Sequence, residues 1–249
     1  HVRLRHDERV RAVDDLLREE LDALLPQEFD GRFEVILSLN TPDPGAAIAI
    51  DALLNDYADP RLRVVDSSDA RGAAHARNVG AAASDAPILA FCDADDVVEV
   101  GWLQALVDGL DTYDGVSGFA TPDRFSTPEQ ARWRPETTPG DLPTYMGHRY
   151  LLSGHLAVRK AAFDAVGGFD TTLTRCEDIA IGWAFTRNGF SIGYVPESIL
   201  HYRYRAGFTQ MMKQAYLYGR GMSEVLIRHG LPVPEGESAG STMFRANNQ

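Results

Sequence analysis

The sequence has 249 residues, a formal net charge of −12 at neutral pH, 44% hydrophobic residues and 24% charged residues. This composition is typical of a globular chain and excludes wholesale disorder. The acidic balance excludes nucleic acid as an expected partner, because contacts with phosphate groups need a dense basic surface. An anionic ligand such as a nucleotide diphosphate would need a bound cation or a local basic cluster.

The length suits one large α/β domain, or one domain with a small appendage. The two cysteines, Cys92 and Cys176, form no CxxC pair, which favours a reducing compartment and a cytoplasmic location. The apolar runs are far shorter than the roughly 20 residues of a membrane-spanning helix. Because the sequence begins with His1 rather than Met, it leaves open whether a targeting segment lies upstream.

Helix and strand patterns alternate through the first 120 residues. The spacing of apolar residues predicts helices over 7–25, 46–57, 72–83 and 102–110. Apolar runs predict strands over 2–5, 33–39, 62–65, 88–92 and 116–120. This alternation predicts an α/β fold with a mostly parallel, doubly wound sheet and helices on both faces. In such sheets ligands bind beyond the carboxyl ends of the strands.

The stretch 121–146 contains five prolines and predicts a long loop, which is either functional or a passive surface segment. Beyond it the pattern predicts helices over 156–165, 177–188 and 208–229, with a strand over 191–195. The last helix is amphipathic and suits core packing, with a membrane-surface or homodimer contact as the alternative. The tail from residue 230 is rich in Pro, Gly, Ser and Asn and is expected to fray.

Two aspartates, Asp93 and Asp95, follow the apolar strand 88–92 directly. Residues two apart project to the same side of an extended backbone, and their carboxylate oxygens suit Mg²⁺ or Mn²⁺ together with a diphosphate. Asp96 adds a third acid, and the repulsion among the three makes sense if a cation sits there. The alternative is a strand-to-helix turn, where Asp is common as a capping residue.

A second acidic pair, Glu177 and Asp178, opens the predicted helix 177–188. One acid could take a proton as general base, and the other could bind an acceptor hydroxyl, because adjacent side chains on a helix diverge by about 100°. The alternative is a pair of carboxylates favoured by the helix N-terminus. Near the end of the chain His201, Arg203 and Arg205 share one face if extended. These three side chains could form an anion site or a metal-plus-phosphate site. The alternative is an edge strand whose charged side chains are solvated.

Taken in order, these segments resemble the family 2 glycosyltransferases of GT-A fold over about 33–205. The resemblance rests on GAAHARNVG at 72–80, ILAFCDADD at 88–96, GHLAVRK at 154–160, VGGFD at 166–170, the Glu177–Asp178 pair, YVPE at 194–197 and HYR at 201–203. It implies a GT-A catalytic domain over 1–205, with a nucleotide-binding half at 1–120 and an acceptor-binding half at 121–205. Residues 206–249 then form the C-terminal helix and flexible tail.

The resemblance also implies roles on the donor side of the reaction. Asp93 would contact the nucleotide ribose, and Asp95 would hold the divalent metal, Mn²⁺ or Mg²⁺, on the diphosphate. Arg77 would lie near the nucleotide. His201 matches a position that can supply a further metal or diphosphate contact, and Arg203 belongs to the same basic strand that meets the diphosphate.

The remaining implied roles concern the reacting groups. Asp178 matches the base of an inverting single displacement, and Glu177 would sit beside the acceptor. Gly154 lies where the backbone comes close to the donor sugar. The acceptor stays open among a saccharide, a lipid-linked molecule and a small molecule. A lipid-linked acceptor would agree with a location at the membrane surface.

The match departs from the family pattern at the nucleotide end. The family's second strand usually ends in an Asp-Asp-Gly-Ser run that reads the base, whereas LNTP stands at 39–42, with Asn40 as the substitute. Its amide can donate and accept, so it could still bind a uracil edge. A UDP-sugar is favoured as donor, with GDP- and dTDP-sugars open. The first strand is followed by RHD at 5–7 in place of the usual Pro-x-Tyr-Asn-like segment.

Two other functions fit parts of this pattern. Nucleotidyl or phosphoryl transfer also uses metal-binding carboxylates after a strand, but the sequence has no Gly-rich Lys-Ser/Thr phosphate loop. A catalytically silent nucleotide-sugar-binding module would keep the fold without the reaction. The retention of both acid pairs argues against it, and the altered base-reading turn at Asn40 argues for it.

Overall fold

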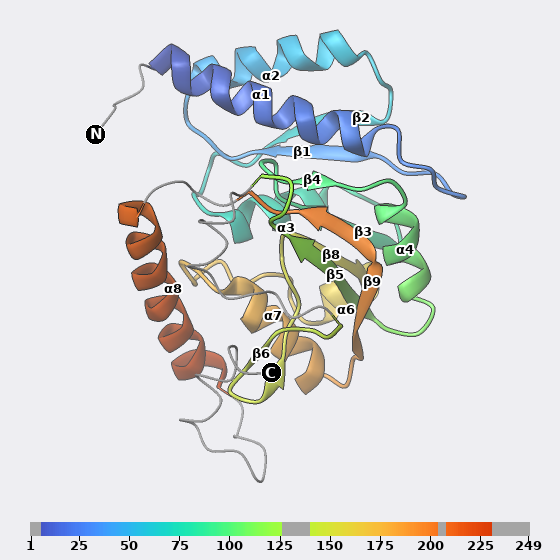
Figure 1. Ribbon diagram of the computed structural model, residues 1–249, viewed down its shortest axis with the longest axis vertical. Helices are drawn as coiled ribbons and strands as arrows, with labels where there is room; N and C mark the ends of the chain where they lie inside the picture. Colours follow the sequence, from blue (N-terminus) through green and yellow to red (C-terminus); the bar gives the residue numbers. More distant parts are fainter. Residues whose placement is uncertain (1–5, 126–139, 204–207, 231–249) are drawn as a thin grey trace.

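The computed structural model describes residues 6–125, 140–203 and 208–230 (Figure 1). The strand expected at 2–5, most of the long loop, Arg205 and the tail after residue 230 lie outside the described residues. None of the helices among the described residues is long and apolar enough to cross a membrane.

The first layer of the fold pairs two helices with two strands. Helices α1 (His6–Leu24) and α2 (Pro44–Tyr57) lie side by side above the parallel pair β1 (Val35–Leu39) and β2 (Leu62–Asp66) (Figure 1). Parallel neighbours need a crossover element, and α2 supplies it. Asp43 caps α2 by accepting from the N–H of Gly45 at 2.9 Å. The layer is held by a buried leucine cluster that includes Leu17, Leu21 and Leu53.

The main sheet has five strands of mixed direction. In spatial order they are β3 (Ile88–Cys92), β8 (His155–Arg159), β5 (Gly115–Thr121), β9 (Ile192–His201) and β4 (Val97–Val98). Only β5 and β9 run parallel among the described pairs of this sheet, and the other three pairs are antiparallel. The α/β fold is confirmed, but the expectation of a mostly parallel sheet is wrong. β8 enters after a loop and β4 after a tight turn, so neither has the crossover helix that parallel neighbours require.

Strand β8 also corrects a predicted element. The pattern predicts one helix over 156–165, whereas the structure has a strand followed by the short helix α6 (Lys160–Ala165). β8 lies between β3 and β5 in the sheet, and both of its faces are covered, because Leu156 and Val158 pack into one core cluster and Ala157 into another. A strand buried on both faces is a continuous apolar run, and period alone does not separate it from a buried helix.

The other predicted helices are confirmed. They are α3 (Ala73–Ala82), α4 (Trp102–Gly109), α7 (Glu177–Arg187) and α8 (Phe208–His229). Strand β9 is longer than expected and runs through Pro196, where its register against β5 shifts, as is typical of proline in a strand. Within 140–150, the two-residue strands β6 (Thr144–Tyr145) and β7 (His148–Arg149) form a hairpin.

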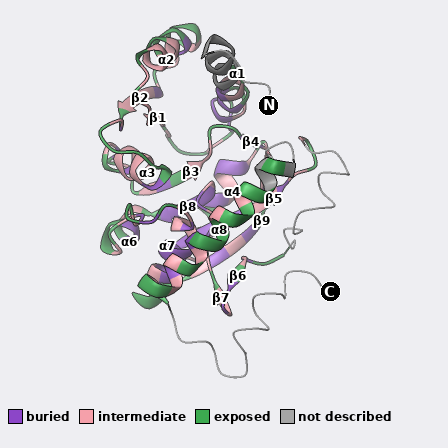
Figure 2. Cartoon of the chain, turned by 90° about the vertical axis from the view of Figure 1, so that its left-hand side faces the viewer, coloured by how far each residue is buried: buried purple, intermediate pink, exposed green. Residues whose placement is uncertain are grey.

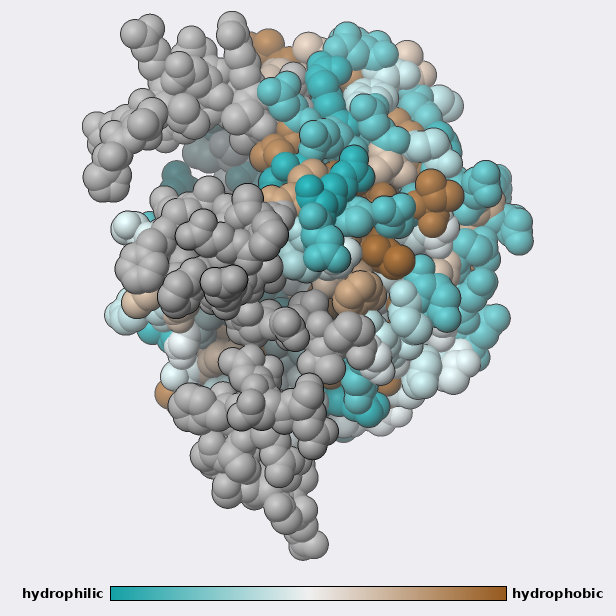
Figure 3. Space-filling view, viewed as in Figure 1, coloured by the Kyte–Doolittle hydropathy of each residue, from teal (hydrophilic) through white to brown (hydrophobic). Residues whose placement is uncertain are grey.

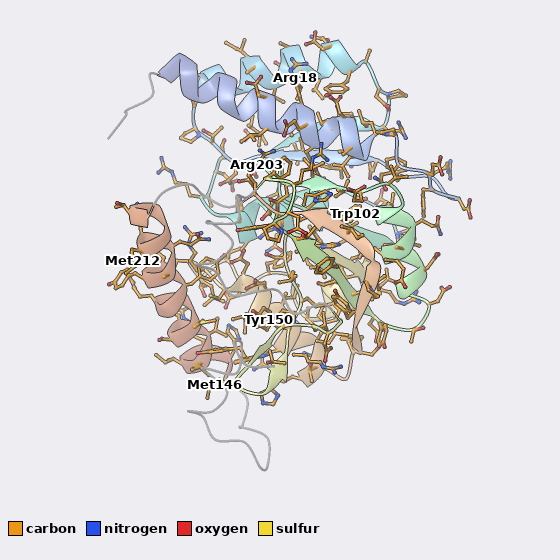
Figure 4. The ribbon with its side chains drawn as sticks, in the orientation of Figure 1. Arg18, Trp102, Met146, Tyr150, Arg203 and Met212 are labelled. Carbon is orange, nitrogen blue, oxygen red and sulfur yellow. The ribbon has the colours of Figure 1, made fainter. Side chains whose placement is uncertain are left out.

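Among the side chains that the structure describes, those in the second half of α8 pack into the core cluster that includes α7. Val225 is fully buried beside Trp183, and Met222 and Leu226 pack partly against the same cluster. In the first half of the helix Met212 and Tyr216 are exposed, and Met212 points away from the rest of the molecule (Figure 4). The expected core packing is therefore found at one end of α8.

The outer surface agrees with the burial pattern. On the side of α2 and α4 the described surface is mostly hydrophilic, with scattered hydrophobic residues (Figure 3). Ile48 of α2 is an exposed hydrophobic residue. Scattered exposed apolar residues are normal for a globular domain. The buried residues gather instead around the five-stranded sheet and α7 (Figure 2).

Candidate active site

A cavity of about 290 Å³ opens where β3 ends; it is called the acidic cavity below. Six of the nine predicted site residues line it: Arg77, Asp93, Asp95, Glu177, Asp178 and Arg203. They come from α3, the turn after β3, the start of α7 and the chain after β9. The fold therefore brings both predicted acid pairs to one place, although about 80 residues separate them in the sequence.

Three carboxylates form a compact group after β3, the aspartate cluster (Asp93, Asp95 and Asp96). One oxygen from each lies within 4.8 Å of the others. A tight turn brings them together, because the N–H of Asp96 donates to the backbone oxygen of Asp93 at 3.2 Å. Oxygen ligands in this number suit a hard divalent cation such as Mn²⁺ or Mg²⁺. The cluster is therefore the part of the cavity that could hold a metal.

Asp96 is the buried member of the aspartate cluster, with 2% of its surface exposed. Burial raises its pKa to about 8; the charges of Asp93 and Asp95 add to the shift, while the N–H of Arg203 opposes it. That N–H donates to Asp96 at 2.8 Å. Asp96 thus ties the turn after β3 to the chain leaving β9.

A further acid lies beneath this cluster and is absent from the predicted site. Glu20 of α1 is 1% exposed, and burial raises its pKa to about 8, with the charges of Asp96 and Asp93 contributing. A buried carboxyl without a full counter-charge is more stable as the neutral acid. The signal was present in the sequence, because Glu20 stands on the apolar stripe of α1 between Leu17 and Leu24.

Arg77 connects the two acid pairs. One guanidinium nitrogen donates to Asp93 Oδ1 at 2.6 Å, and another donates to Glu177 Oε1 at 2.8 Å. The side chain is 12% exposed and stands 5.5 Å from the centre of the Phe169 ring. Burial works against its charged form, but the carboxylates of Asp93 and Glu177 outweigh this effect and raise its pKa. Arg77 is therefore a buried cation shared by two acids.

Asp178 has the environment of a proton acceptor. Burial raises its pKa to about 7, the charge of Glu177 adds to this, and the N–H of Ile179 and the charge of Arg77 oppose it. The Ile179 N–H donates to Asp178 Oδ1 at 2.8 Å. A pKa near the working pH suits a general base. Cys176, the residue just before the first residue of α7, has a left-handed φ of 63°.

Gly154 lies against the aspartate cluster. A Cβ atom at this position would stand 2.7 Å from Asp93 Oδ2, closer than real Cβ contacts allow. The chain entering β8 can therefore approach Asp93 only because residue 154 has no side chain. The neighbour of this backbone is Asp93, and an approach to the donor sugar stays a prediction.

Asn40 does not line the acidic cavity. Its amide nitrogen donates to the backbone oxygen of Ala70 at 2.7 Å and to that of Ser67, and its oxygen accepts the N–H of Gly72 at 3.0 Å. The side chain thus joins the end of β1 to the loop before α3. These contacts occupy both ends of the amide that was expected to read a base.

His201 and Arg203 are held by acids rather than directed jointly at the cavity. His201 Nε2 pairs with Glu99, and among the described residues the potential metal-binding group does not include His201. Arg203 lines the cavity, donates from Nε to the backbone oxygen of Asp95 at 2.9 Å and pairs with Glu19 of α1. It lies between α1 and the main sheet (Figure 4), with its guanidinium 3.7 Å from the centre of the Phe125 ring.

Five polar residues of the cavity wall were not predicted: Ser153, Arg175, Tyr202, Gln214 and Tyr218. Gln214 and Tyr218 come from α8, the helix for which the pattern indicates only packing. They stand four residues apart and so share a helix face. Their spacing gives no sign of a ligand, because the same pattern describes an ordinary amphipathic helix.

A larger cavity, about 450 Å³, lies between the loop 166–171 and α7. It contains none of the predicted site residues, and polar groups in its wall are engaged within the protein. Asn78 donates to and accepts from the backbone of Phe169, and Asp170 pairs with His229 at 2.7 Å. Size alone does not make it the reactive site, whereas the acidic cavity gathers acids with shifted pKa values.

Known proteins share this sequence pattern. The chain is 26% identical over 200 residues to a pre-mycofactocin glycosyltransferase of Mycobacterium tuberculosis, covering 75% of this chain and 42% of the relative. It is 26% identical over 209 residues to the O-antigen biosynthesis protein RfbC of Myxococcus xanthus, covering 72% of this chain and 15% of that protein. The chain thus spans less than half the length of these curated relatives.

Solved structures share the fold at low sequence identity. A mannosyltransferase from Pyrobaculum calidifontis, in complex with GDP-Man and Mn²⁺, matches with a TM-score of 0.67 and 18% identity over 89% of this chain and 62% of that one. TarS 1-349 of S. aureus, in complex with UDP-GlcNAc, matches with a TM-score of 0.61 and 16% sequence identity. That match covers 88% of this chain and 65% of the TarS chain. These neighbours establish the expected GT-A fold.

The model for glycosyl transferase family 2 matches residues 10–167, more than half of the chain, and the protein belongs to that family.

Proposed function

We propose that this chain is a metal-dependent, inverting glycosyltransferase that moves a sugar from a nucleotide diphosphate to an acceptor hydroxyl. The observation that carries the proposal is the acidic cavity. It joins the aspartate cluster, which suits a metal and a diphosphate, to Asp178, which suits a proton acceptor. A binding module has no need of a carboxyl with a pKa near neutrality in that position.

On the donor side, Asp93 would contact the ribose and Asp95 would hold Mn²⁺ or Mg²⁺ with Asp96 beside it. When bound, the metal would supply positive charge that offsets the charge of the diphosphate. Arg203, which lines the cavity, is the protein's own cation for the same purpose. The neighbours with GDP-Man and Mn²⁺, and with UDP-GlcNAc, support a nucleotide-sugar donor. A UDP-sugar remains the favoured donor, with GDP- and dTDP-sugars as alternatives.

On the acceptor side, Asp178 would take the proton from the acceptor hydroxyl as its oxygen attacks the anomeric carbon. The new carbon–oxygen bond forms on the face opposite the diphosphate, whose bond to the sugar breaks and leaves its electron pair on the nucleoside diphosphate. The anomeric configuration is therefore inverted. Base assistance of this kind contributes roughly 10²–10⁴-fold. Glu177 would stand beside the acceptor, oriented by its ion pair with Arg77.

Two predicted donor contacts lack support from the cavity. Neither Asn40 nor His201 belongs to its lining residues, and each is bonded to neighbouring protein groups. The proposal therefore does not use them. Selection of the nucleotide base then falls to other parts of the nucleotide-binding half.

The decisive experiment incubates the protein with Mn²⁺ and a panel of UDP-, GDP- and dTDP-sugars, together with saccharide, lipid-linked and small-molecule acceptors. Release of free nucleoside diphosphate with a new glycoside of inverted configuration is the expected result. Release of pyrophosphate would instead indicate nucleotidyl transfer. Saturable nucleotide-sugar binding without turnover for any acceptor would indicate a silent binding module. Thermal-shift screening selects the donor first, because a ligand of the folded state raises its apparent stability.

A further inference from the structure

The geometry points to Arg77 as a positioning residue that couples the donor side of the cavity to the acceptor side; this inference rests on the proposed function. Arg77 is separated in sequence from Asp93 by 16 residues and from Glu177 by 100. Its two guanidinium nitrogens nevertheless bond to both, at 2.6 and 2.8 Å. Removing or moving either acid therefore changes the position of the rigid, planar guanidinium, and with it the contact to the other acid.

The burial of the bridge makes this coupling strong. The side chains of Arg77 and Glu177 are 12% and 16% exposed, so water screens their pairing far less than that of a surface pair. Asp93 is more open, at 38%, which leaves it accessible to a ligand. The bridge thus has a protected acceptor end and an exposed donor end.

Asp93 has its two oxygens in different surroundings. Oδ1 accepts from Arg77, while Oδ2 faces the chain at Gly154. As long as Glu177 holds the other guanidinium nitrogen, Arg77 occupies one oxygen of Asp93 and leaves the second for a ribose hydroxyl. Without Glu177 the planar fork could turn and take both oxygens, because Arg–carboxylate pairs favour the two-bond arrangement.

The inference predicts that Glu177, a residue assigned to the acceptor, controls nucleotide affinity through Arg77. The experiment measures the affinity of UDP, GDP and dTDP, each with Mn²⁺, by calorimetry in wild type, Glu177→Gln, Arg77→Met and the double variant. We expect Glu177→Gln to weaken binding about fivefold in the wild-type background and to change it little in the Arg77→Met background, as coupled neighbours do.

Two further variants serve as a control and as a substitute for Arg77→Met. Glu34→Gln removes an acid from another arginine–glutamate pair, the 2.8 Å contact with Arg63 outside the cavity, and should leave nucleotide affinity unchanged. Arg77→Lys replaces Arg77→Met if the methionine variant fails to fold by circular dichroism. A lysine keeps the charge but is a point donor without the planar fork, so Glu177→Gln should again have little effect in that background.

The outcomes separate this inference from the proposed function. If wild type binds a nucleotide and Glu177→Gln binds it equally well, the coupling is wrong and the glycosyltransferase proposal stands. Equal losses from Glu177→Gln in the presence and absence of Arg77 would also overturn the coupling, since the effect would not pass through the guanidinium. If wild type binds none of the three nucleotides with Mn²⁺, the proposed function fails, and the inference fails with it.

Discussion

Gly154 and Asp93 lie so close together that a methyl group on Gly154 would stand 2.7 Å from Asp93 Oδ2. Gly154→Ala should therefore push the Asp93 carboxylate aside and weaken nucleotide binding about tenfold, the loss of one well-placed hydrogen bond to a charged group. Calorimetry with UDP and Mn²⁺ measures the effect. Gly219→Ala is the control, because a Cβ at Gly219 has no atom within 4 Å. If Gly154→Ala binds the nucleotide with wild-type affinity, the present position of the Asp93 carboxylate is not required for nucleotide binding.

Asp178→Asn should lower kcat at least 100-fold, in the range that a general base contributes, and leave nucleotide affinity nearly unchanged. Steady-state kinetics and calorimetry on the same preparation separate the two effects. The matched control is Asp164→Asn, which removes an exposed carboxylate paired with Lys160 and should retain wild-type turnover. An Asp178→Asn variant that turns over normally would remove Asp178 from the mechanism.

The pH dependence of the reaction should reflect the same carboxyl. The pKa of Asp178 is raised to about 7, and only its ionised form can accept a proton. The value of kcat/KM should therefore rise with pH and level off above about 7, because this profile reports groups of the free enzyme. A rate already constant between pH 5 and 8 would mean that another group, or none, takes the proton.

Asp95→Ala should abolish the Mn²⁺-dependent part of nucleotide binding, because it removes one of the three carboxylates of the aspartate cluster. The measurement is nucleotide affinity with Mn²⁺ and with EDTA. Wild type should lose affinity in EDTA, while the variant should bind with the same low affinity in both. A variant whose affinity still depends on Mn²⁺ to the wild-type extent would place the metal elsewhere.

Glu20 should make the stability of the fold depend on pH. Its pKa rises from the ordinary 4.5 to about 8 on folding, so the folded state holds a proton that the unfolded chain releases. Its contribution is complete below about pH 4.5, is lost as pH rises to about 8, and then stays constant. The loss is on the order of a few kcal/mol. Glu20→Gln, which cannot ionise, should match wild type near pH 5 and exceed its unfolding free energy near pH 8.

Urea denaturation at the two pH values, in EDTA, measures this difference. The exposed Glu28 gives the control Glu28→Gln, which should follow wild type at both pH values. A Glu20→Gln variant with the wild-type pH dependence would contradict the assignment of a neutral buried carboxyl.

Several elements could be predicted because their sequence signals are local. The run 88–92 is apolar and ends in acids, and the observed β3 has the same bounds, Ile88–Cys92. Helix α7 begins at Glu177, where the acidic pair indicated a helix N-terminus. These patterns depend on residues a few positions apart, where period and capping chemistry act directly.

Other features were decided by partners far away in the chain. β8 is a strand because β3 and β5 lie on either side of it, a fact that its own apolar run does not contain. Asn40 is engaged with the loop before α3, and His201 with Glu99, and the family pattern alone does not contain these contacts. The secondary structure of β8 and the contacts of Asn40 and His201 depend on which groups lie beside them in the folded protein, and tertiary packing decides this.

By itself, the sequence determined most of the helices, the strand β3 and the acids at their ends, because hydrophobic period and the chemistry of element ends act over one or two turns. Tertiary structure alone decided that Arg77 joins Asp93 to Glu177, that Glu20 lies beneath the aspartate cluster, and that α8 forms a wall of the cavity. Those relationships join residues that are far apart in the sequence, such as Arg77 and Glu177, which are 100 positions apart. Their strength comes from burial, which no local pattern specifies.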